Sequence, residues 1–226
     1  MTWTVRDRKS SPMYVFCRKA FLRTCAVGVF SVLLLVFMCL GWVFPRHAQA
    51  HPHVFAECGL ALVFEDAGLA AVRQTWVFDE FYSAMVLMDL GLALSGDLDE
   101  AARKRVRAYT FDTLKPYDYF TRIRVDGERV AISDPRSFAA RVHEGRLVFE
   151  FEIAAPVPAL EETRLVTMAV YDESFYTFMD FPPLEVVMEG AAEDFDITWE
   201  DRDQTTERYF YDQITPVVLD VEFGRK

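Results

Sequence analysis

The fold depends on residues 54–78, which read VFAECGLALVFEDAGLAAVRQTWVF. Apolar side chains occupy every second position of residues 54–64, a period that is typical of a β-strand with one buried face. A turn at residues 65–68 separates this strand from a second run of the same kind, so that the pair predicts a β-hairpin. The inward positions of the second strand are predicted to be Ala70, Val72, Gln74, Trp76 and Phe78.

Beyond residue 78 the apolar side chains recur at helical spacing, at Phe81, Ala84, Met85 and Met88. Asp79 directly precedes this run and is predicted to cap the helix. A second helix is predicted to begin at a pair that resembles a capping box, Asp97 and Glu100, and to run to about Leu114. We therefore expect a helical pair inserted at about residues 79–115.

After Pro116 the chain consists of short runs rich in Val, Phe and Tyr, separated by frequent turn signals. Such punctuation favours an antiparallel sheet or sandwich. No repeat, linker or low-complexity tract interrupts residues 51–226. The sequence therefore predicts one α+β domain, a mostly antiparallel β sheet or sandwich with an inserted helical pair.

Residues 1–50 have the features of an export signal. Arg18, Lys19 and Arg23 precede an uncharged apolar stretch at residues 24–45, and Ala48-Gln49-Ala50 follows as a small-x-small cleavage pattern. We expect cleavage after Ala50, a periplasmic location and no membrane span in the cleaved protein. The alternative is a retained membrane anchor, because about 18 apolar residues can just cross a bilayer.

Cysteine usage is compatible with this cleavage. Three of the four cysteines lie in residues 1–50, so that a cleaved chain keeps Cys58 alone and forms no intramolecular disulfide. Cys58 belongs to the apolar face of the first strand, and we interpret it as a small buried hydrophobic residue.

The charge of the chain is strongly asymmetric. Residues 1–50 hold seven of the 24 basic and one of the 35 acidic side chains, which leaves 17 basic and 34 acidic residues and a net charge of −17 on the remainder. A body that acidic offers no basic surface to a nucleic-acid backbone, and an anionic membrane surface repels it. Cationic partners are favoured.

Histidines gather at the predicted cleavage site. A chain cut after Ala50 begins His51-Pro52-His53, and its terminal amine and two imidazoles can chelate one divalent transition metal. Imidazole nitrogen suits Zn, Cu, Ni and Co. The alternative is a frayed polar N-terminus with two incidental histidines. His143 precedes a Glu-Gly pair and is interpreted as a solvated hairpin residue.

Three carboxylates are candidates for further metal ligands. Asp79 and Glu80 lie at the predicted strand-to-helix junction, and Asp172 ends a strong β run. Loops at such places carry functional side chains on a rigid scaffold. Helix capping by Asp79 and turn formation by Asp172 are equally compatible with the sequence.

Enzyme signatures are absent from the sequence after residue 50. It contains no G-x-S-x-G nucleophile elbow, no glycine-rich phosphate loop and no H-E-x-x-H zinc motif. We therefore expect a protein that is not an enzyme.

Four segments, taken in order, resemble a known family. They are HPHVF (residues 51–55), WVFDEFYS (76–83), YDYF (117–120) and YDESFY (171–176). The family comprises bacterial exported proteins labelled "ABC-type uncharacterised transport system, periplasmic component", and the resemblance covers essentially all of residues 51–226. It implies a periplasmic protein associated with zinc, nickel or cobalt transport, with an ABC transporter or another inner-membrane metal permease as partner.

Members of that family often carry an Asp-rich, calcium-loop-like segment between the two helices. Residues 89–100 have the length of such a loop, but Gly91 and Ala93 replace oxygen ligands and Leu94 stands where a glycine is needed. This departure predicts that calcium binds poorly or not at all.

Two other functions stay open. An N-terminal histidine on a β-rich domain is similar to the periplasmic copper-resistance carriers, in which the terminal amine and imidazole hold Cu(II). The other alternative is an acidic adaptor that docks on a membrane permease and binds no metal itself.

The first prediction concerns the leader. The exported protein is expected to begin at His51, because basic residues, apolar run and Ala-x-Ala pattern follow one another in the required order. N-terminal sequencing or intact mass measures this. A mature chain that still carries Ala50, or an uncut leader, would contradict it and would remove the terminal amine from the proposed chelate.

Overall fold

The computed structural model describes residues 35–36, 52–180 and 186–226. The chain divides into two compact units, Met1–Gln49 and Ala50–Lys226. In the first unit the described residues, 35–36, are helical. The predicted signal peptide and His51 lie outside the described residues.

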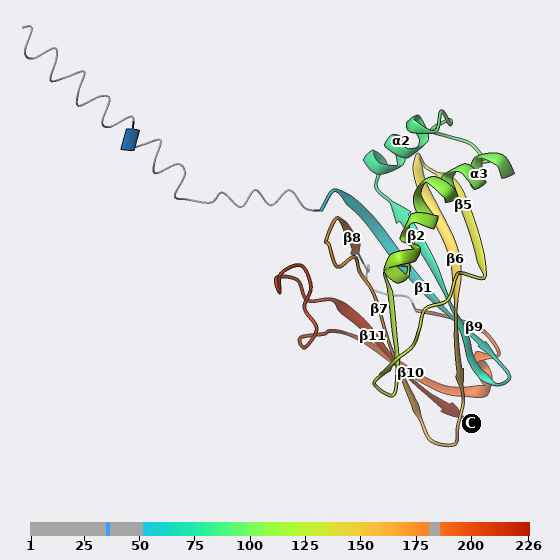
Figure 1. Ribbon diagram of the computed structural model, residues 1–226. Helices are drawn as coiled ribbons and strands as arrows, with labels where there is room; N and C mark the ends of the chain where they lie inside the picture. Colours follow the sequence, from blue (N-terminus) through green and yellow to red (C-terminus); the bar gives the residue numbers. More distant parts are fainter. Residues whose placement is uncertain (1–34, 37–51, 181–185) are drawn as a thin grey trace, which may run out of the picture. The chain divides into compact units, whose positions relative to one another are not determined.

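The hairpin predicted at residues 54–78 forms the centre of one sheet, whose order is β5-β6-β2-β1-β8, with β9 also paired to β1 (Figure 1). β8 and β9 run parallel to β1, whereas the other pairs are antiparallel. The strands are β1 (Val54–Glu65), β2 (Gly68–Phe78), β5 (Ser137–His143), β6 (Arg146–Pro158), β8 (Thr177–Asp180) and β9 (Val187–Gly190).

A second sheet has the order β10-β11-β7-β3-β4 and is antiparallel throughout. Aromatic rings join the two sheets, since Phe64 of the first packs against Phe195 and Phe223 of the second, each with ring centroids 5.3 Å apart. The strands are β3 (Thr121–Val125), β4 (Glu128–Arg129), β7 (Arg164–Val170), β10 (Phe195–Asp203) and β11 (Val217–Arg225).

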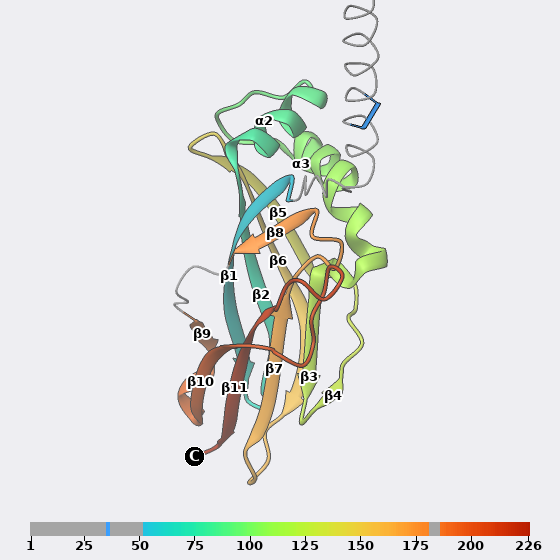
Figure 2. The same ribbon diagram turned by 90° about the vertical axis from the view of Figure 1, so that its left-hand side faces the viewer.

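The helical insertion connects the two sheets. It comprises α2 (Glu80–Asp89) and α3 (Glu100–Val106), and α3 continues through a π-helical turn (Arg107–Phe111) into a 3₁₀ helix (Asp112–Phe120). Figure 2 shows this insertion across one end of the strands. The predicted α+β fold, a mostly antiparallel sandwich with a helical insert, is confirmed.

The predicted helix starts are partly right. Asp79 caps α2, because its side chain accepts a hydrogen bond from Tyr82 N. The capping-box start at Asp97 is wrong. Asp99 caps α3 by accepting a hydrogen bond from Ala102 N. The helical backbone ends close to the expected Leu114, because Tyr117, Asp118 and Tyr119 have non-helical φ and ψ angles.

The alternating pattern of β1 is confirmed, with Val54, Cys58 and the other inward positions buried. In β2 the expectation fails at Ala70, which is half-buried, whereas Leu69 is buried. The cause is a β-bulge between Leu69 and Ala71 in the pairing with β6, which shifts the alternation by one residue.

One buried polar network crosses between the sheets. The Gln74 side chain on β2 donates to Thr121 Oγ1 on β3 at 2.8 Å, and its Oε1 accepts from Trp76 Nε1 at 3.0 Å. Thr121 Oγ1 in turn donates to the Tyr119 carbonyl at 2.9 Å. Since buried polar groups are costly unless they are hydrogen-bonded, this network fixes the relative position of the two sheets at Gln74.

Gly190 is the basis of the second prediction. It has φ +71°, and a Cβ placed there would lie 2.1 Å from Phe64 O on the neighbouring strand β1. Gly145→Ala is the matched control, because Gly145 has φ +79° but nothing within 4 Å of its Cβ position.

Gly145→Ala should cost about 1–2 kcal/mol through backbone strain alone, and Gly190→Ala should cost about 3 kcal/mol or more because the clash adds to that strain. Urea unfolding of both variants measures this. Equal losses would show that the contact between Gly190 and Phe64 does not limit this position.

Candidate functional site

A cavity of about 670 Å³ lies where the helical insertion meets the sandwich. Its walls come from β2, from α2, from the segment at residues 107–120 and from the turn between β7 and β8. We name it the aromatic pocket. Its aromatic lining residues are Trp76, Phe78, Tyr82, Tyr109, Tyr117, Phe120, Phe149 and Tyr176.

Trp76 forms the base of the aromatic pocket. It is buried, its ring stacks on Phe120 with centroids 6.1 Å apart, and it meets the edge of Phe151 at 4.9 Å. Because Gln74 accepts the hydrogen bond from its indole N–H, the ring has a single orientation in the core. The base of the pocket is therefore rigid.

Asp172 lines the same pocket from the β7–β8 turn and is only 6% exposed. Its Oδ1 accepts hydrogen bonds from Ser174 N at 2.9 Å and Ser174 Oγ at 2.7 Å, and its Oδ2 accepts from Thr177 N at 3.0 Å. These bonds give Asp172 the turn-forming role that the sequence left open.

Asp79 also uses both carboxylate oxygens within the fold. Oδ1 accepts from Tyr82 N at the start of α2, and Oδ2 accepts from Phe55 N on β1, both at 2.8 Å. The Asp79 backbone N–H donates to Phe55 O as well. Asp79 therefore ties the helix to the N-terminal strand, while its neighbour Glu80 is exposed.

His53 lies at the edge of the aromatic pocket. Its side chain is exposed, its backbone N–H donates to Tyr176 O at 2.9 Å, and its ring lies 5.0 Å from the Tyr176 ring. His143 is exposed at the β5–β6 turn.

The structure brings three candidate segments together. The β2–α2 junction bonds to Phe55 through Asp79, and the turn that contains Asp172 bonds to His53 through Tyr176. Among residues 35–36, 52–180 and 186–226, however, no group of three His, Cys, Asp or Glu side chains is placed to hold a metal ion. An ion bound by His53 therefore needs further ligands from outside the described residues, and His51 is one residue that lies there.

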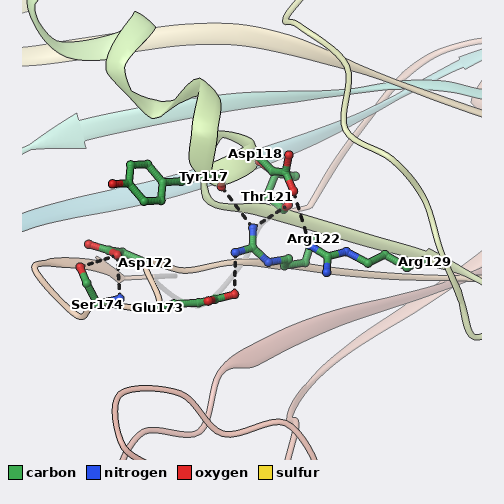
Figure 3. Close-up of polar contacts among 8 residues, drawn as sticks. All are labelled: Tyr117, Asp118, Thr121, Arg122, Arg129, Asp172, Glu173 and Ser174. Atoms are coloured by element: carbon green, nitrogen blue, oxygen red, sulfur yellow. Dashed lines mark hydrogen bonds and ion pairs between the residues drawn. The ribbon is translucent and has the colours of Figure 1, made fainter.

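A second, more polar cavity of about 450 Å³ shares Tyr117, Phe120, Asp172 and Ser174 with the aromatic pocket. Figure 3 shows its polar contacts, in which Arg122 Nη2 donates to Glu173 Oε1 at 2.9 Å and Arg129 Nη2 lies 3.4 Å from Asp118 Oδ2. Arg122 also donates to the Thr121 carbonyl. Both guanidinium groups are thus paired with carboxylates.

The backbone between the two cavities is strained. Asp118, Tyr119 and Phe120 have φ values of 54°, 50° and 56°, and Phe175 on the opposing turn has φ 55°. Non-glycine residues in this region cost roughly 1–3 kcal/mol each, and such strain clusters at functional sites. Residues 210–212 have the same left-handed conformation, so the segment between the cavities is one of two strained runs among the described residues.

Comparison with known proteins gives a family. The family described as "Protein of unknown function (DUF1007)" matches residues 35–211. The chain belongs to this family. A relative, the "Uncharacterized 15.5 kDa protein in trpE 3'region" of Spirochaeta aurantia, is 30% identical over 96 residues, which are 42% of this chain and 68% of the relative.

In this DUF1007 protein, the described helices of residues 35–36, 52–180 and 186–226 include none with the length and apolar character needed to cross a membrane.

The electrostatics of the aromatic pocket are clearest at Tyr82. Burial raises the pKa of the Tyr82 phenol to about 12, and negative charge on Tyr176, Tyr109 and Asp79 acts in the same direction. Tyr109 donates to Asp89 Oδ2 at 2.9 Å, which raises its pKa too. Tyr82 and Tyr109 therefore keep their phenol protons at ordinary pH.

Sequence reasoning missed the aromatic pocket as a site. Tyr117 and Tyr176 belong to segments that carry the family resemblance, but they are 59 positions apart and nothing in the pattern shows that they face one cavity. Tyrosines that recur in several such segments were the available signal.

The third prediction concerns Asp79. Asp79→Ala should lower the free energy of unfolding by about 2 kcal/mol, because it removes a helix cap worth about 1 kcal/mol and the bond to Phe55 N worth about as much. Asp99→Ala is the control, since Asp99 caps α3 without a bond to another strand, and should cost about 1 kcal/mol. Urea unfolding compares them, and equal losses would argue against a stabilising link to β1.

Proposed function

We propose that this DUF1007 protein is an exported accessory component of a transition-metal transport system and receives a divalent zinc, nickel or cobalt ion as its cargo at the N-terminal histidines. The observation that supports this most is the convergence of three segments on the start of β1. His53 is bonded through its backbone to Tyr176, and Phe55 is bonded to Asp79.

The anchoring of β1 gives the histidines a defined place. Since both ends of the segment 53–55 are hydrogen-bonded to neighbouring elements, the imidazole of His53 projects from a fixed strand start and not from a frayed end. Imidazole nitrogen is a preferred donor for zinc, nickel and cobalt. The terminal amine and the imidazole of His51 would supply the remaining nitrogen donors.

The carboxylates then take different roles from one another. Asp79 and Asp172 already accept hydrogen bonds from backbone N–H groups on both oxygens, so that they hold the segments around the site in place. Glu80 is exposed and remains the carboxylate that would reach an ion directly. The net charge of −17 on residues 51–226 raises the local concentration of cations before capture.

An adaptor for a membrane permease is the second candidate, and the exposed face of α2 favours it. Phe81 is 77% and Met88 70% exposed, with Met85 between them also partly exposed. Exposed apolar side chains that share a helix face mark surfaces for protein–protein contact. The two functions are compatible, because α2 begins at the Asp79 junction that holds the histidine segment.

The fourth prediction tests the metal site. Calorimetric titration of the exported protein with Zn²⁺ and Ni²⁺ should show one tight site. The double variant His51→Ala/His53→Ala should lower the affinity of that site by about 100-fold or more, because removing a group that only supports a ligand already lowers metal affinity by about 10–100-fold. The fold should be unaffected, because the His53 side chain is exposed and His51 precedes the first strand. His143→Ala is the control and should leave the affinity unchanged.

The outcomes separate the candidates. Unchanged affinity in the double variant would place the metal site elsewhere, and no binding in the parent protein would leave the permease adaptor. A protein that instead takes up copper, with a visible d–d absorption band lost in the double variant, would support the copper carrier.

A further inference from the structure

The aromatic pocket has a composition unlike that of a metal site. Eight of its seventeen lining residues are aromatic, and no Lys, Arg or His is among them. Its volume of about 670 Å³ falls in the range of small-molecule sites, which is about 300–1,000 Å³. The pocket therefore suits an organic molecule and not a bare transition-metal ion, because its lining holds no imidazole or thiolate and Asp172 is its one carboxylate.

The charge around the pocket has one sign. Asp172 is the charged side chain in its lining, and the hydrogen bonds from Ser174 and Thr177 hold that carboxylate in place. At the rim, Asp89 accepts from Tyr109. In the adjoining polar cavity the two arginines are matched by Glu173 and Asp118, so that they leave no positive charge to offset Asp172.

Tyrosine rings surround the entrance. Tyr117 is 60% exposed and faces the turn of Asp172 and Ser174, as Figure 3 shows, while Tyr176 lines the pocket from the far end of that turn. A ring face attracts a cation within about 6 Å of its centroid, and several rings together form the cages that recognise ammonium groups. The aromatic rings of the pocket and the buried carboxylate of Asp172 are the groups from which such a cage is built.

We propose that the aromatic pocket binds an organic ammonium ion, whose alkyl substituents contact the tyrosine rings and Trp76 and whose charge is balanced by Asp172. Anions are disfavoured because no lining side chain is cationic. A neutral ligand would gain the apolar contacts but not the attraction to the ring faces and the carboxylate. Hydrogen bonds hold two walls of the cage in position before the ligand arrives, at Trp76 through Gln74 and at the turn of Asp172 through Ser174 and Thr177.

This site adjoins the proposed metal site at the N-terminal histidines, because Tyr176 lines the pocket and contacts His53. Tyr117 has no contact with that segment among the hydrogen bonds and ring contacts of the described residues, whereas Tyr176 packs on His53. Tyr117 is therefore the residue whose replacement tests the cage alone.

The fifth prediction uses choline as the probe and 3,3-dimethylbutan-1-ol, in which carbon replaces the ammonium nitrogen, as the neutral isostere. Calorimetric titration of the exported protein should show choline binding at least about 10-fold tighter than the isostere, since only choline carries the positive charge that the ring faces and Asp172 attract. Tyr117→Leu should weaken choline binding by about 10-fold, whereas Tyr117→Phe, which keeps the ring, should retain it.

Two further variants sharpen the result. Asp172→Asn removes the charge and one of the hydrogen-bond acceptors of the turn, and should weaken choline binding more than binding of the isostere. Tyr211→Leu is the matched control, because Tyr211 is 86% exposed and does not line the pocket, and should change nothing. Zn²⁺ titration of Tyr117→Leu should match the parent protein, so that loss of the cage is distinguished from loss of the metal site.

Equal affinity for choline and the isostere would overturn the proposal, and so would the absence of choline binding at millimolar concentration. Choline binding that survives Tyr117→Leu and Asp172→Asn would place the ammonium site outside the pocket and overturn it as well.

Discussion

The buried amide of Gln74 is the interaction on which the arrangement of this domain depends. It bonds Trp76 on its own strand and Thr121 on the opposite sheet, and Thr121 passes the link on to the Tyr119 carbonyl. One side chain therefore joins the two sheets, orients the base of the aromatic pocket and holds the end of the helical insertion. An apolar residue at position 74 would fill the space but leave Trp76 Nε1 without its acceptor.

The sequence predicted the fold correctly where apolar residues recur at a regular spacing, because that spacing reflects a buried face. The alternation over residues 54–64 follows directly from a strand with one apolar face, and the structure has that strand. The errors lie where the local sequence is compatible with more than one strand register or more than one helix cap. Ala70 is not an inward residue because a bulge shifts the register against β6. Asp97 is not the helix cap because Asp99, which is also acidic, lies directly before α3 and accepts from its first turn. Neither bulges nor competing caps leave a periodic signal.

The candidate site was predictable in its parts and not in its assembly. Asp79 and Asp172 are prominent in the sequence, yet the sequence left open whether their oxygens face a ligand or the backbone, and the structure shows backbone N–H partners for both. The pocket that they flank depends on the sandwich bringing residues 76, 117 and 176 to one place. Such long-range proximity comes from sheet pairing and from the Gln74 network, and no local pattern encodes it.

Cys58 has a consequence for how the chain withstands oxidants. It is the free cysteine of the described residues, it is fully buried on β1, and burial raises the pKa of its thiol. Because the thiolate is the reactive form, the folded domain is protected from oxidants and from mixed disulfides with other proteins at this residue. An unfolded chain lacks this protection until β1 is buried, so that the speed of folding decides how long the Cys58 thiol is open to oxidation.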